Sequence, residues 1–133
     1  MIRIPLAIHE ELMDHARSGF PLEVCGILGG NEESVSLLFR MTNSDASNEH
    51  FTMEPREQFK VIKELRAGGL GMLAIYHSHP ESPARPSEED IRLALTPEVS
   101  HVIISLQNPE QPVIRSFKIS NGIVTPEEVT VGE

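Results

Sequence analysis

Two histidines that lie two positions apart, His77 and His79, are the residues of this sequence best suited to bind a metal ion. They follow the apolar run 72–76, which predicts a buried strand. Because side chains alternate across a strand, both imidazoles are expected on one side of it. Their nitrogens can then bind one zinc ion at about 2.0–2.1 Å. Pro80 ends the strand directly after the pair. A His-x-His pair by itself is a weak signal for a metal site.

Asp90 is the candidate third ligand. A loop that carries several prolines leads from His79 to Ser87, which fits the N-cap of a helix with Asp90 in its first turn. This loop can bring the carboxylate back over the strand end. Three protein ligands leave one tetrahedral position for water, as in catalytic zinc sites, where the pKa of the water falls to about 7. The alternative is that Asp90 only stabilises the start of the helix.

Such a water needs a proton acceptor, and Glu23 is a candidate. It opens the short apolar segment 23–28, which precedes a pair of glycines. A carboxylate at the end of a strand can take a proton from water and pass it to a leaving amine. Spacing alone does not select Glu23 among the acidic residues, and an ordinary surface acid is the alternative.

These segments together resemble the JAMM (MPN-plus) metalloprotease signature, His-x-His-Pro-x6-Ser-x2-Asp. The matching residues are His77-Ser78-His79-Pro80 and, after six further positions, Ser87-Glu88-Glu89-Asp90. The segment Glu23-Val24-Cys25-Gly26-Ile27-Leu28-Gly29 is similar to the family segment that carries the catalytic glutamate. The resemblance runs from about residue 21 to residue 90, and every position of the motif is filled.

The resemblance implies a role for each of these residues. His77, His79 and Asp90 would bind Zn²⁺, and Glu23 would act as general base and then as general acid. Ser87 would help to stabilise the oxyanion of the tetrahedral intermediate. Ser-x-x-acid is also a helix-capping pattern, so Ser87 has a structural alternative that is compatible with the catalytic one.

The resemblance also implies a substrate class. Family members cleave isopeptide or peptide bonds after the C-terminal Gly-Gly of ubiquitin-like proteins, and short prokaryotic members process sulfur-carrier proteins. Two alternatives stay open: a non-catalytic interaction module with the same fold, and a zinc amidase that acts on a small-molecule amide. A zinc deaminase is excluded, because its Pro-Cys-x-x-Cys ligands need two cysteines and the chain has only Cys25.

The elements that would position these residues alternate in type. Strands are predicted over 2–8, 23–28, 35–41, 72–76, 102–106, 113–119 and 123–131. Helices are predicted over 9–18, from Pro55 to the Gly68-Gly69 pair, and from Ser87 to Thr96-Pro97, the last with an inner face of Ile91, Ala94 and Leu95. Asn121-Gly122 predicts a tight hairpin, and Pro126 places the last strand at a sheet edge. The expected fold class is α/β, with a mixed β-sheet sandwiched by helices, and the resemblance implies a cytidine-deaminase-like JAB/MPN fold.

Composition limits the other possibilities. The 133 residues fit one domain, 1–133, and the net charge of −9 comes without a cluster of Lys and Arg. Nucleic acid and membrane are therefore unexpected partners. No signal peptide is recognised, so a cytoplasmic protein is expected, and the oligomeric state stays open. Cys25 is interpreted as a small buried apolar residue. The remaining histidines lack metal-ligand spacing and are expected to be structural or solvated: His9, His15, His50 and His101.

Overall fold

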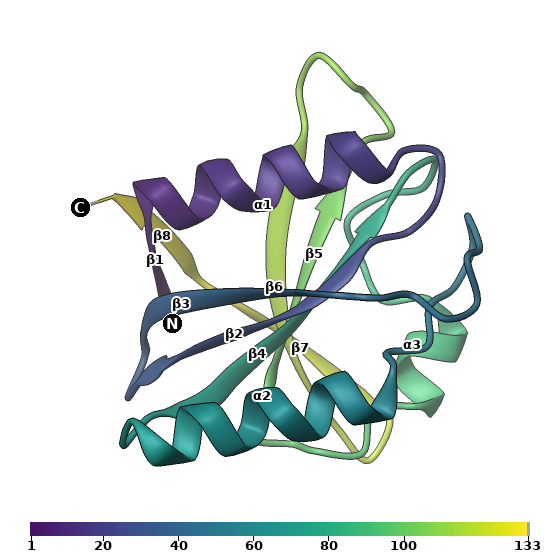
Figure 1. Cartoon of the computed structure of the whole chain (residues 1–133). Helices are drawn as coiled ribbons and strands as arrows, with labels where there is room; N and C mark the ends of the chain where they lie inside the picture. The colour runs from purple at the N-terminus through teal and green to yellow at the C-terminus, as the bar shows by residue number, and fades with distance from the viewer. Residues whose placement is uncertain (133) are drawn as a thin grey trace.

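The structure, a computed structural model, describes residues 1–132 as one mixed β-sheet with helices on both faces (Figure 1). The strands are β1 (Ile2–Pro5), β2 (Cys25–Asn31), β3 (Ser34–Met41), β4 (Gly71–His79), β5 (Ser100–Ser105), β6 (Val113–Ser120), β7 (Ile123–Glu127) and β8 (Val129–Gly132). The helices are α1 (Leu6–Gly19), α2 (Pro55–Ala67) and α3 (Glu88–Arg92). The predicted α/β class with a helix-flanked mixed sheet is confirmed.

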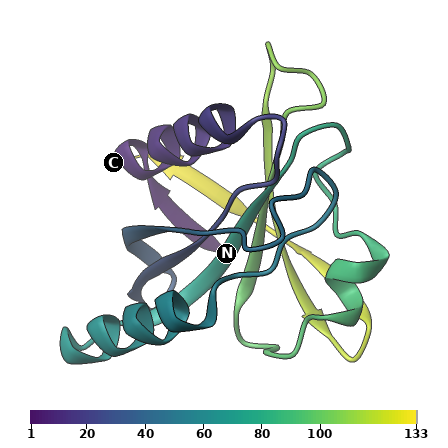
Figure 2. The same ribbon diagram turned by 45° about the vertical axis from the view of Figure 1, so that its right-hand side comes forward.

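The eight strands follow the order β7-β6-β5-β4-β2-β3-β1-β8. β4 lies in the middle, antiparallel to β2 and parallel to β5. β4 is therefore a central strand. Ala74 and Tyr76 pack in the cluster on one face of the sheet and Met72 and Ile75 in the cluster on the other, which agrees with the apolar character of the run 72–76 on both faces. The two views in Figures 1 and 2 show β4 crossing the molecule between α1 and α2.

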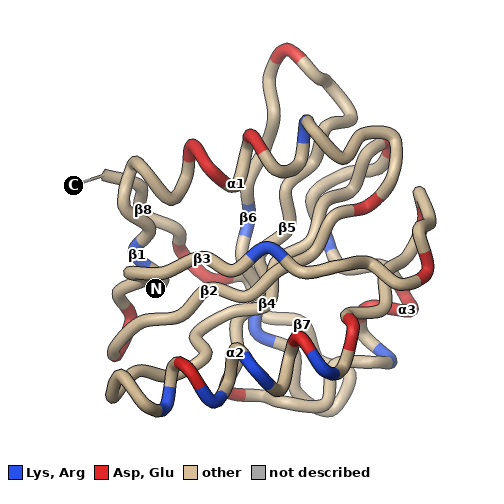
Figure 3. The backbone as a smooth tube through the Cα atoms, viewed as in Figure 1, with Lys and Arg blue, Asp and Glu red and all other residues tan. Residues whose placement is uncertain are grey.

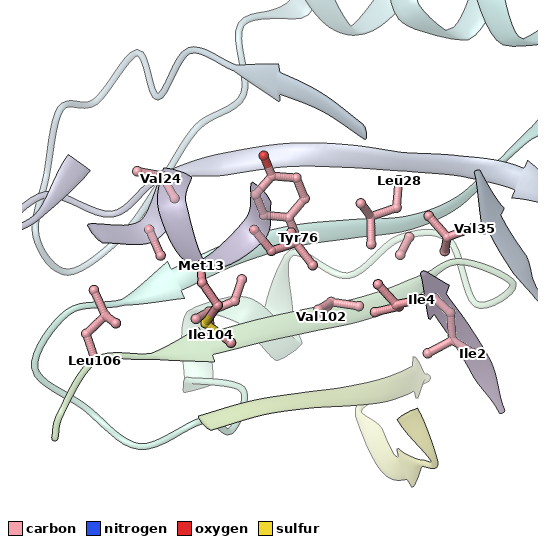
Figure 4. Packing of buried hydrophobic residues seen from close by; sticks show 13 residues of the cluster. Ile2, Ile4, Met13, Val24, Leu28, Val35, Tyr76, Val102, Ile104 and Leu106 are labelled. Atoms are coloured by element: carbon pink, nitrogen blue, oxygen red, sulfur yellow. The ribbon is translucent and has the colours of Figure 1, made fainter. Parts of the chain in front are cut away.

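The larger core lies between the sheet and α1 (Figure 4). Ile8, Leu12 and Ala16, four residues apart on α1, all pack in this cluster. On the sheet side, Tyr76 of β4 is fully buried there. Its ring lies over Gly26 of the neighbouring strand β2, where a Cβ atom would overlap the tyrosine ring. Gly26 therefore makes room for the large side chain next to His77.

The second core lies on the opposite face, under α2. Val61 and Leu65 of this helix pack against Cys25 and Ile27 of β2. Ile75 of β4 packs against the same cluster. Residues alternate across each strand, so the odd-numbered positions of β4 that follow Ile75 point to the α2 side of the sheet. This alternation directs His77 and His79 to the same side, as predicted.

The start of α1 differs from the expectation. The helix begins at Leu6 rather than His9, and β1 ends at Pro5. The reason is the four-residue spacing from Ile8 to Leu12, which places Ile8 on the buried helical face. The prediction of a strand through residue 8 was wrong because a short apolar run does not distinguish the two element types.

The third helix also differs. α3 spans only Glu88–Arg92, and Leu95 of the expected inner face is 86% exposed. Pro97 disfavours the helical conformation of Thr96, and the apolar side chains of Leu93 and Leu95 before it are exposed. The predicted inner face through Leu95 was therefore wrong, although the helix start at Ser87 is confirmed.

The C-terminal segment makes a hairpin and then changes sides. Asn121 and Gly122 have φ angles of 52° and 78°, as the predicted two-residue turn requires. β7, which contains Pro126, is an edge strand as expected. The predicted single strand over 123–131 is broken at Glu128, and β8 pairs with β1 at the opposite edge of the sheet.

Charged residues are spread over the molecule rather than gathered by sign. Figure 3 shows Lys and Arg interleaved with Asp and Glu along α2, and other basic positions on separate strands. Among residues 1–132, no helix has the length and apolar character needed to cross a bilayer.

Candidate metal centre

Three side chains from two elements converge at the end of β4. The Nε2 atoms of His77 and His79 lie 3.0 Å apart, and both face Oδ2 of Asp90. The distances to this oxygen are 3.2 Å from His77 and 3.3 Å from His79. The histidines come from β4 and the aspartate from α3, so the proline-bearing loop between them returns over the strand end as predicted.

The triangle has the size that a tetrahedral ion requires. Metal–ligand bonds of about 2.0–2.1 Å at tetrahedral angles place neighbouring ligand atoms about 3.3–3.4 Å apart. The three observed separations, 3.0, 3.2 and 3.3 Å, lie within a few tenths of an ångström of that edge. The residues present therefore fit a tetrahedral cation with two nitrogen ligands and one oxygen ligand.

The tautomer of His79 supports the same conclusion. Its Nδ1 lies 2.8 Å from the carbonyl oxygen of Pro83, which only an N–H can approach as a donor. Neutral His79 therefore carries its proton on Nδ1 and presents a lone pair at Nε2. Such a lone pair, opposite a second imidazole and a carboxylate oxygen, is stabilised by a cation at the centre. A backbone carbonyl that orients a ligand histidine is a usual companion of protein metal sites.

His77 is oriented in a different way. Its Nδ1 is buried and has no hydrogen-bond partner within residues 1–132. The ring is instead stacked on Phe51, with centroids 4.6 Å apart and an interplanar angle of 29°. Burial lowers the pKa of His77 and outweighs the opposing effect of Asp90. The neutral imidazole that a metal needs is thus the favoured form.

Asp90 is held as a carboxylate. Burial would raise its pKa, but the hydrogen bonds with His77 and His79 outweigh this and move the pKa well below its usual range. For His79, burial lowers the pKa, and the hydrogen bonds with Asp90 and Pro83 reverse the net direction upward. Without a metal ion, Asp90 is therefore an ionised carboxylate whose Oδ2 lies within hydrogen-bond distance of both imidazole rings.

Ser87 sets the position of Asp90 through a reciprocal helix cap. The Ser87 hydroxyl accepts from the backbone N–H of Asp90 at 3.0 Å, and the Ser87 N–H donates to Oδ2 of Asp90 at 2.9 Å. The structural alternative for Ser87 is therefore present in the fold. The side chain is nevertheless exposed, and its hydroxyl proton is not used by the cap.

Glu23 lies just before β2 and is 4% exposed. Its Oε1 is buried without a hydrogen-bond partner within the described residues. Burial raises the pKa of Glu23 to about 7, while the nearby His79 opposes this rise and Asp90 adds to it. Cys25 is paired with His77 in the antiparallel β2–β4 ladder, so Glu23, two residues before Cys25, lies beside the end of β4 that carries His79. Glu23 is therefore not the solvated surface acid of the alternative interpretation.

The backbone of Glu23 is fixed by three neighbours. Its N–H donates to the carbonyl of Ser47 at 2.8 Å, and its carbonyl accepts from Nδ2 of Asn43 at 3.1 Å. The next residue, Val24, donates its N–H to the hydroxyl of Ser78 at 2.9 Å. Ser78 lies between the two ligand histidines, so β4 carries the ligands on one side and a brace for the Glu23 segment on the other.

A groove of about 250 Å³ adjoins the centre between α2 and α3. Phe51, Met53 and Leu93 contribute apolar walls, and His77 and Asp90 form part of the lining. The groove thus opens onto two of the candidate metal ligands.

A family model described as prokaryotic homologs of the JAB domain matches residues 5–120 of the chain. The chain belongs to this JAB family. The resemblance to JAMM proteins that the motif indicates is thereby confirmed.

Several relatives of this JAB protein carry the names of peptidases. It is 36% identical over 124 residues to "CysO-cysteine peptidase" of Mycobacterium tuberculosis, which covers 92% of the chain and 85% of the relative. It is 35% identical over 95 residues to "Probable TtuB-protein conjugate cleaving protease" of Thermus thermophilus, covering 71% and 64%. Among solved structures, protein DSY2949 of Desulfitobacterium hafniense matches with a TM-score of 0.91 and 44% identity, covering 100% of this chain and 94% of the other. The JAB protein is accordingly an enzyme of the peptidase class.

The sequence analysis did not identify several residues that lie around the candidate metal centre. Phe51, Asn43 and Pro83 lie in loops whose sequence carries no ligand spacing, and only the fold brings them to the site. His101, expected to be structural or solvated, lines the groove beside Leu93. Its position opposite Ile75 in the parallel β4–β5 pair was the available signal, and it required the strand register.

Proposed function

We propose that this chain is a zinc-dependent peptidase that hydrolyses the amide bond after the C-terminal Gly-Gly of a ubiquitin-like or sulfur-carrier protein. The observation that carries the proposal is the convergence of His77, His79 and Asp90 on one point near the buried Glu23. The names of the relatives support the substrate class, since they refer to CysO-cysteine and to TtuB-protein conjugates.

His77, His79 and Asp90 would hold the ion through Nε2, Nε2 and Oδ2. A zinc ion bound by three protein ligands polarises a carbonyl and lowers the pKa of water to about 7. The carbonyl of Pro83 keeps the proton of His79 away from the centre, and Phe51 keeps the ring of His77 in place. Zinc suits the mixture of imidazole and carboxylate ligands in a tetrahedral arrangement.

Glu23 would accept the proton of the attacking water and deliver it to the leaving amine. A pKa raised to about 7 by burial suits both steps near neutral pH, since the carboxyl can gain and lose the proton readily. The unpartnered Oε1 gives the proton an acceptor atom. The contacts to Asn43 and Ser47 fix the backbone of Glu23, which limits the displacement of this carboxylate.

Ser87 would donate its free hydroxyl proton to the oxyanion while its oxygen continues to cap α3. Both roles are compatible, because the cap uses a lone pair and the donation uses the proton. The substrate tail would lie in the groove beside Phe51 and Leu93. Two glycines at the scissile end allow the substrate backbone to approach the centre without side-chain overlap.

The experiment uses a sulfur-carrier protein that ends in Gly-Gly followed by one extra amino acid, incubated with zinc-loaded enzyme. Mass spectrometry follows loss of the extra residue. Glu23→Gln should retain about one zinc per chain and lose about 100-fold or more in kcat. Glu88→Gln, an exposed acid close to the centre, is the control and should cleave like the wild type.

Other outcomes identify the alternatives. Zinc binding with no cleavage of any Gly-Gly conjugate favours an interaction module. Turnover of small amides together with inert carrier conjugates favours a small-molecule amidase. Undiminished cleavage by Glu23→Gln refutes the role of Glu23.

A further inference from the structure

The side chain of Asn43 makes four hydrogen bonds at the junction between β3 and the loop over residues 42–54, called here the Asn43 loop. Its Nδ2 donates to the carbonyl oxygens of Glu23 and His50, each at 3.1 Å. Its Oδ1 accepts from the N–H groups of Asp45 at 3.1 Å and Thr52 at 3.0 Å. A half-buried asparagine with two donors and two acceptor positions in use is fully satisfied.

The chemistry of these partners fixes the orientation of the amide. Both groups near Nδ2 are carbonyl oxygens, and both groups near Oδ1 are N–H groups. A flipped amide would face four groups of the wrong kind. No other side chain of the same size offers two donors and two acceptor lone pairs in this arrangement, so the contact set is specific to asparagine.

Three of the four bonds hold the Asn43 loop closed. They join Asn43 to Asp45, His50 and Thr52, and the carbonyl of Thr52 also accepts from the N–H of Ser44 at 2.9 Å. The loop carries Phe51, which is stacked on His77, and it forms one wall of the groove. The shape of this loop therefore reaches both a candidate metal ligand and the substrate groove.

The fourth bond leaves the loop and reaches the carbonyl of Glu23. Ser47 of the same loop accepts the N–H of Glu23, so the peptide groups on both sides of this residue are bound to the Asn43 loop. Glu23 precedes β2 and has no place in the ladder of that strand. The position of its side chain thus depends on the loop as well as on the sheet.

We propose that Asn43 is a positioning residue of the peptidase, which holds Glu23 in place through the Asn43 loop. The four hydrogen bonds of its side chain all go to backbone groups. Its effect passes through the backbone of Glu23. The inference rests on the proposed function, because it assigns Asn43 to the residue that would move the proton.

Asn43→Asp separates this role from general loop stability. An aspartate keeps the acceptor oxygen for Asp45 and Thr52 but loses both donations, and it places a carboxylate oxygen opposite the carbonyl of Glu23. We expect kcat to fall about 10- to 100-fold, because a small displacement of a proton-transfer group has a cost of that order. KM should change by less than about threefold, and zinc content should stay at about one per chain.

A readout independent of activity is amide hydrogen exchange. In zinc-loaded Asn43→Asp, exchange of the Glu23 amide should accelerate, because its bond to Ser47 opens more often, while the amides of β5 keep their protection. The matched control is Ser44→Ala, which removes the hydroxyl bond to the Thr52 carbonyl but leaves the backbone bond and the contacts of Asn43. Its kcat and Glu23 exchange should equal those of the wild type.

A folded Asn43→Asp protein with wild-type kcat and unchanged Glu23 exchange overturns the inference. Equal losses in Asn43→Asp and Ser44→Ala also overturn it, since they indicate that any weakening of the loop is enough. Failure of the proposed function would give a different result: the wild type would cleave no carrier conjugate, or Glu23→Gln would remain fully active. If Asn43→Asp does not fold, Asn43→Ser, with a smaller uncharged side chain, replaces it in the same measurements.

Discussion

The Nδ1–H group of His79 donates to the carbonyl oxygen of Pro83 at 2.8 Å, so in the neutral ring Nε2 carries a lone pair and no proton. A lone pair buried opposite His77 and Asp90 is a costly arrangement unless a cation balances it. The metal site is therefore expected to influence the stability of the folded chain as well as its activity.

Zinc should stabilise the wild-type protein against heat, and His77→Ala should abolish this effect. A ligand present at 100 to 1,000 times its Kd adds roughly 2.7–4.1 kcal/mol to the free energy of unfolding. Thermal unfolding with zinc and with a chelator, together with metal analysis, measures the difference. His9→Ala, on α1 and away from the centre, should keep about one zinc per chain and the full thermal shift.

Replacing Ser87 tests whether its hydroxyl does more than cap α3. Ser87→Gly should lose only a few tenths of a kcal/mol of cap energy, because glycine is tolerated at an N-cap. If the hydroxyl donates to the oxyanion, kcat should fall by about 10²-fold while zinc content remains at the wild-type level. Steady-state kinetics and metal analysis on the same preparation decide this. Wild-type kcat in Ser87→Gly would leave the cap as the whole role of Ser87.

Gly26→Ala should destabilise the fold through Tyr76. The added methyl group would overlap the buried tyrosine ring, and overpacking of this kind costs about 1–3 kcal/mol. Denaturant unfolding measures the loss. Gly71→Ala, also at a strand position but with no atom near the added methyl group, is the matched control and should stay close to the wild type.

Stability should decline in mild acid because of His15. Its Nδ1 is hydrogen-bonded to the hydroxyl of Tyr76 at 2.7 Å, and burial lowers its pKa from 6.5 to about 4. Between these values the unfolded chain binds more protons than the folded one, so the free energy of unfolding falls as pH drops from about 6.5 to about 4. Because the ring is only half-buried, we expect a contribution of about 1–2 kcal/mol.

The comparison uses zinc-free wild type and His15→Gln, unfolded in denaturant at several pH values. The stability difference between the two proteins isolates the contribution of His15 from that of the metal ligands. The advantage of the wild type at pH 7 should shrink toward pH 4. A difference that is constant over this range would show that His15 titrates alike in both states.

The sequence predicts those parts of the centre that depend on local geometry. His77 and His79 share a side because a strand alternates, and Asp90 lies in a first turn because Ser87 caps it. The contributions of Phe51 and Asn43 could not be predicted from the sequence. Each contacts a site residue far away in the chain, and only the folded sheet brings the two together. Glu23 could be selected only through the family motif, because its environment depends on the Asn43 loop, which is bound to its backbone.

The incorrect predictions about the fold also have local causes. Leu95 has the spacing of a buried helical residue, but burial needs a partner element, and none covers this segment of the described chain. The break at Glu128 follows from sheet geometry, since β8 pairs with β1 while β7 pairs with β6 at the other edge. Neither outcome is encoded in periodicity alone.

Because side chains alternate between the two faces of β4, a shift of this strand by one residue would disrupt the site. Ser78 braces the segment of Glu23 from the side opposite the two imidazoles. Deleting one residue between Gly71 and Tyr76 would swap the two sides, turning the imidazoles toward α1 and the serine toward α2. Homologues that retain catalysis should therefore show no insertions or deletions within this strand.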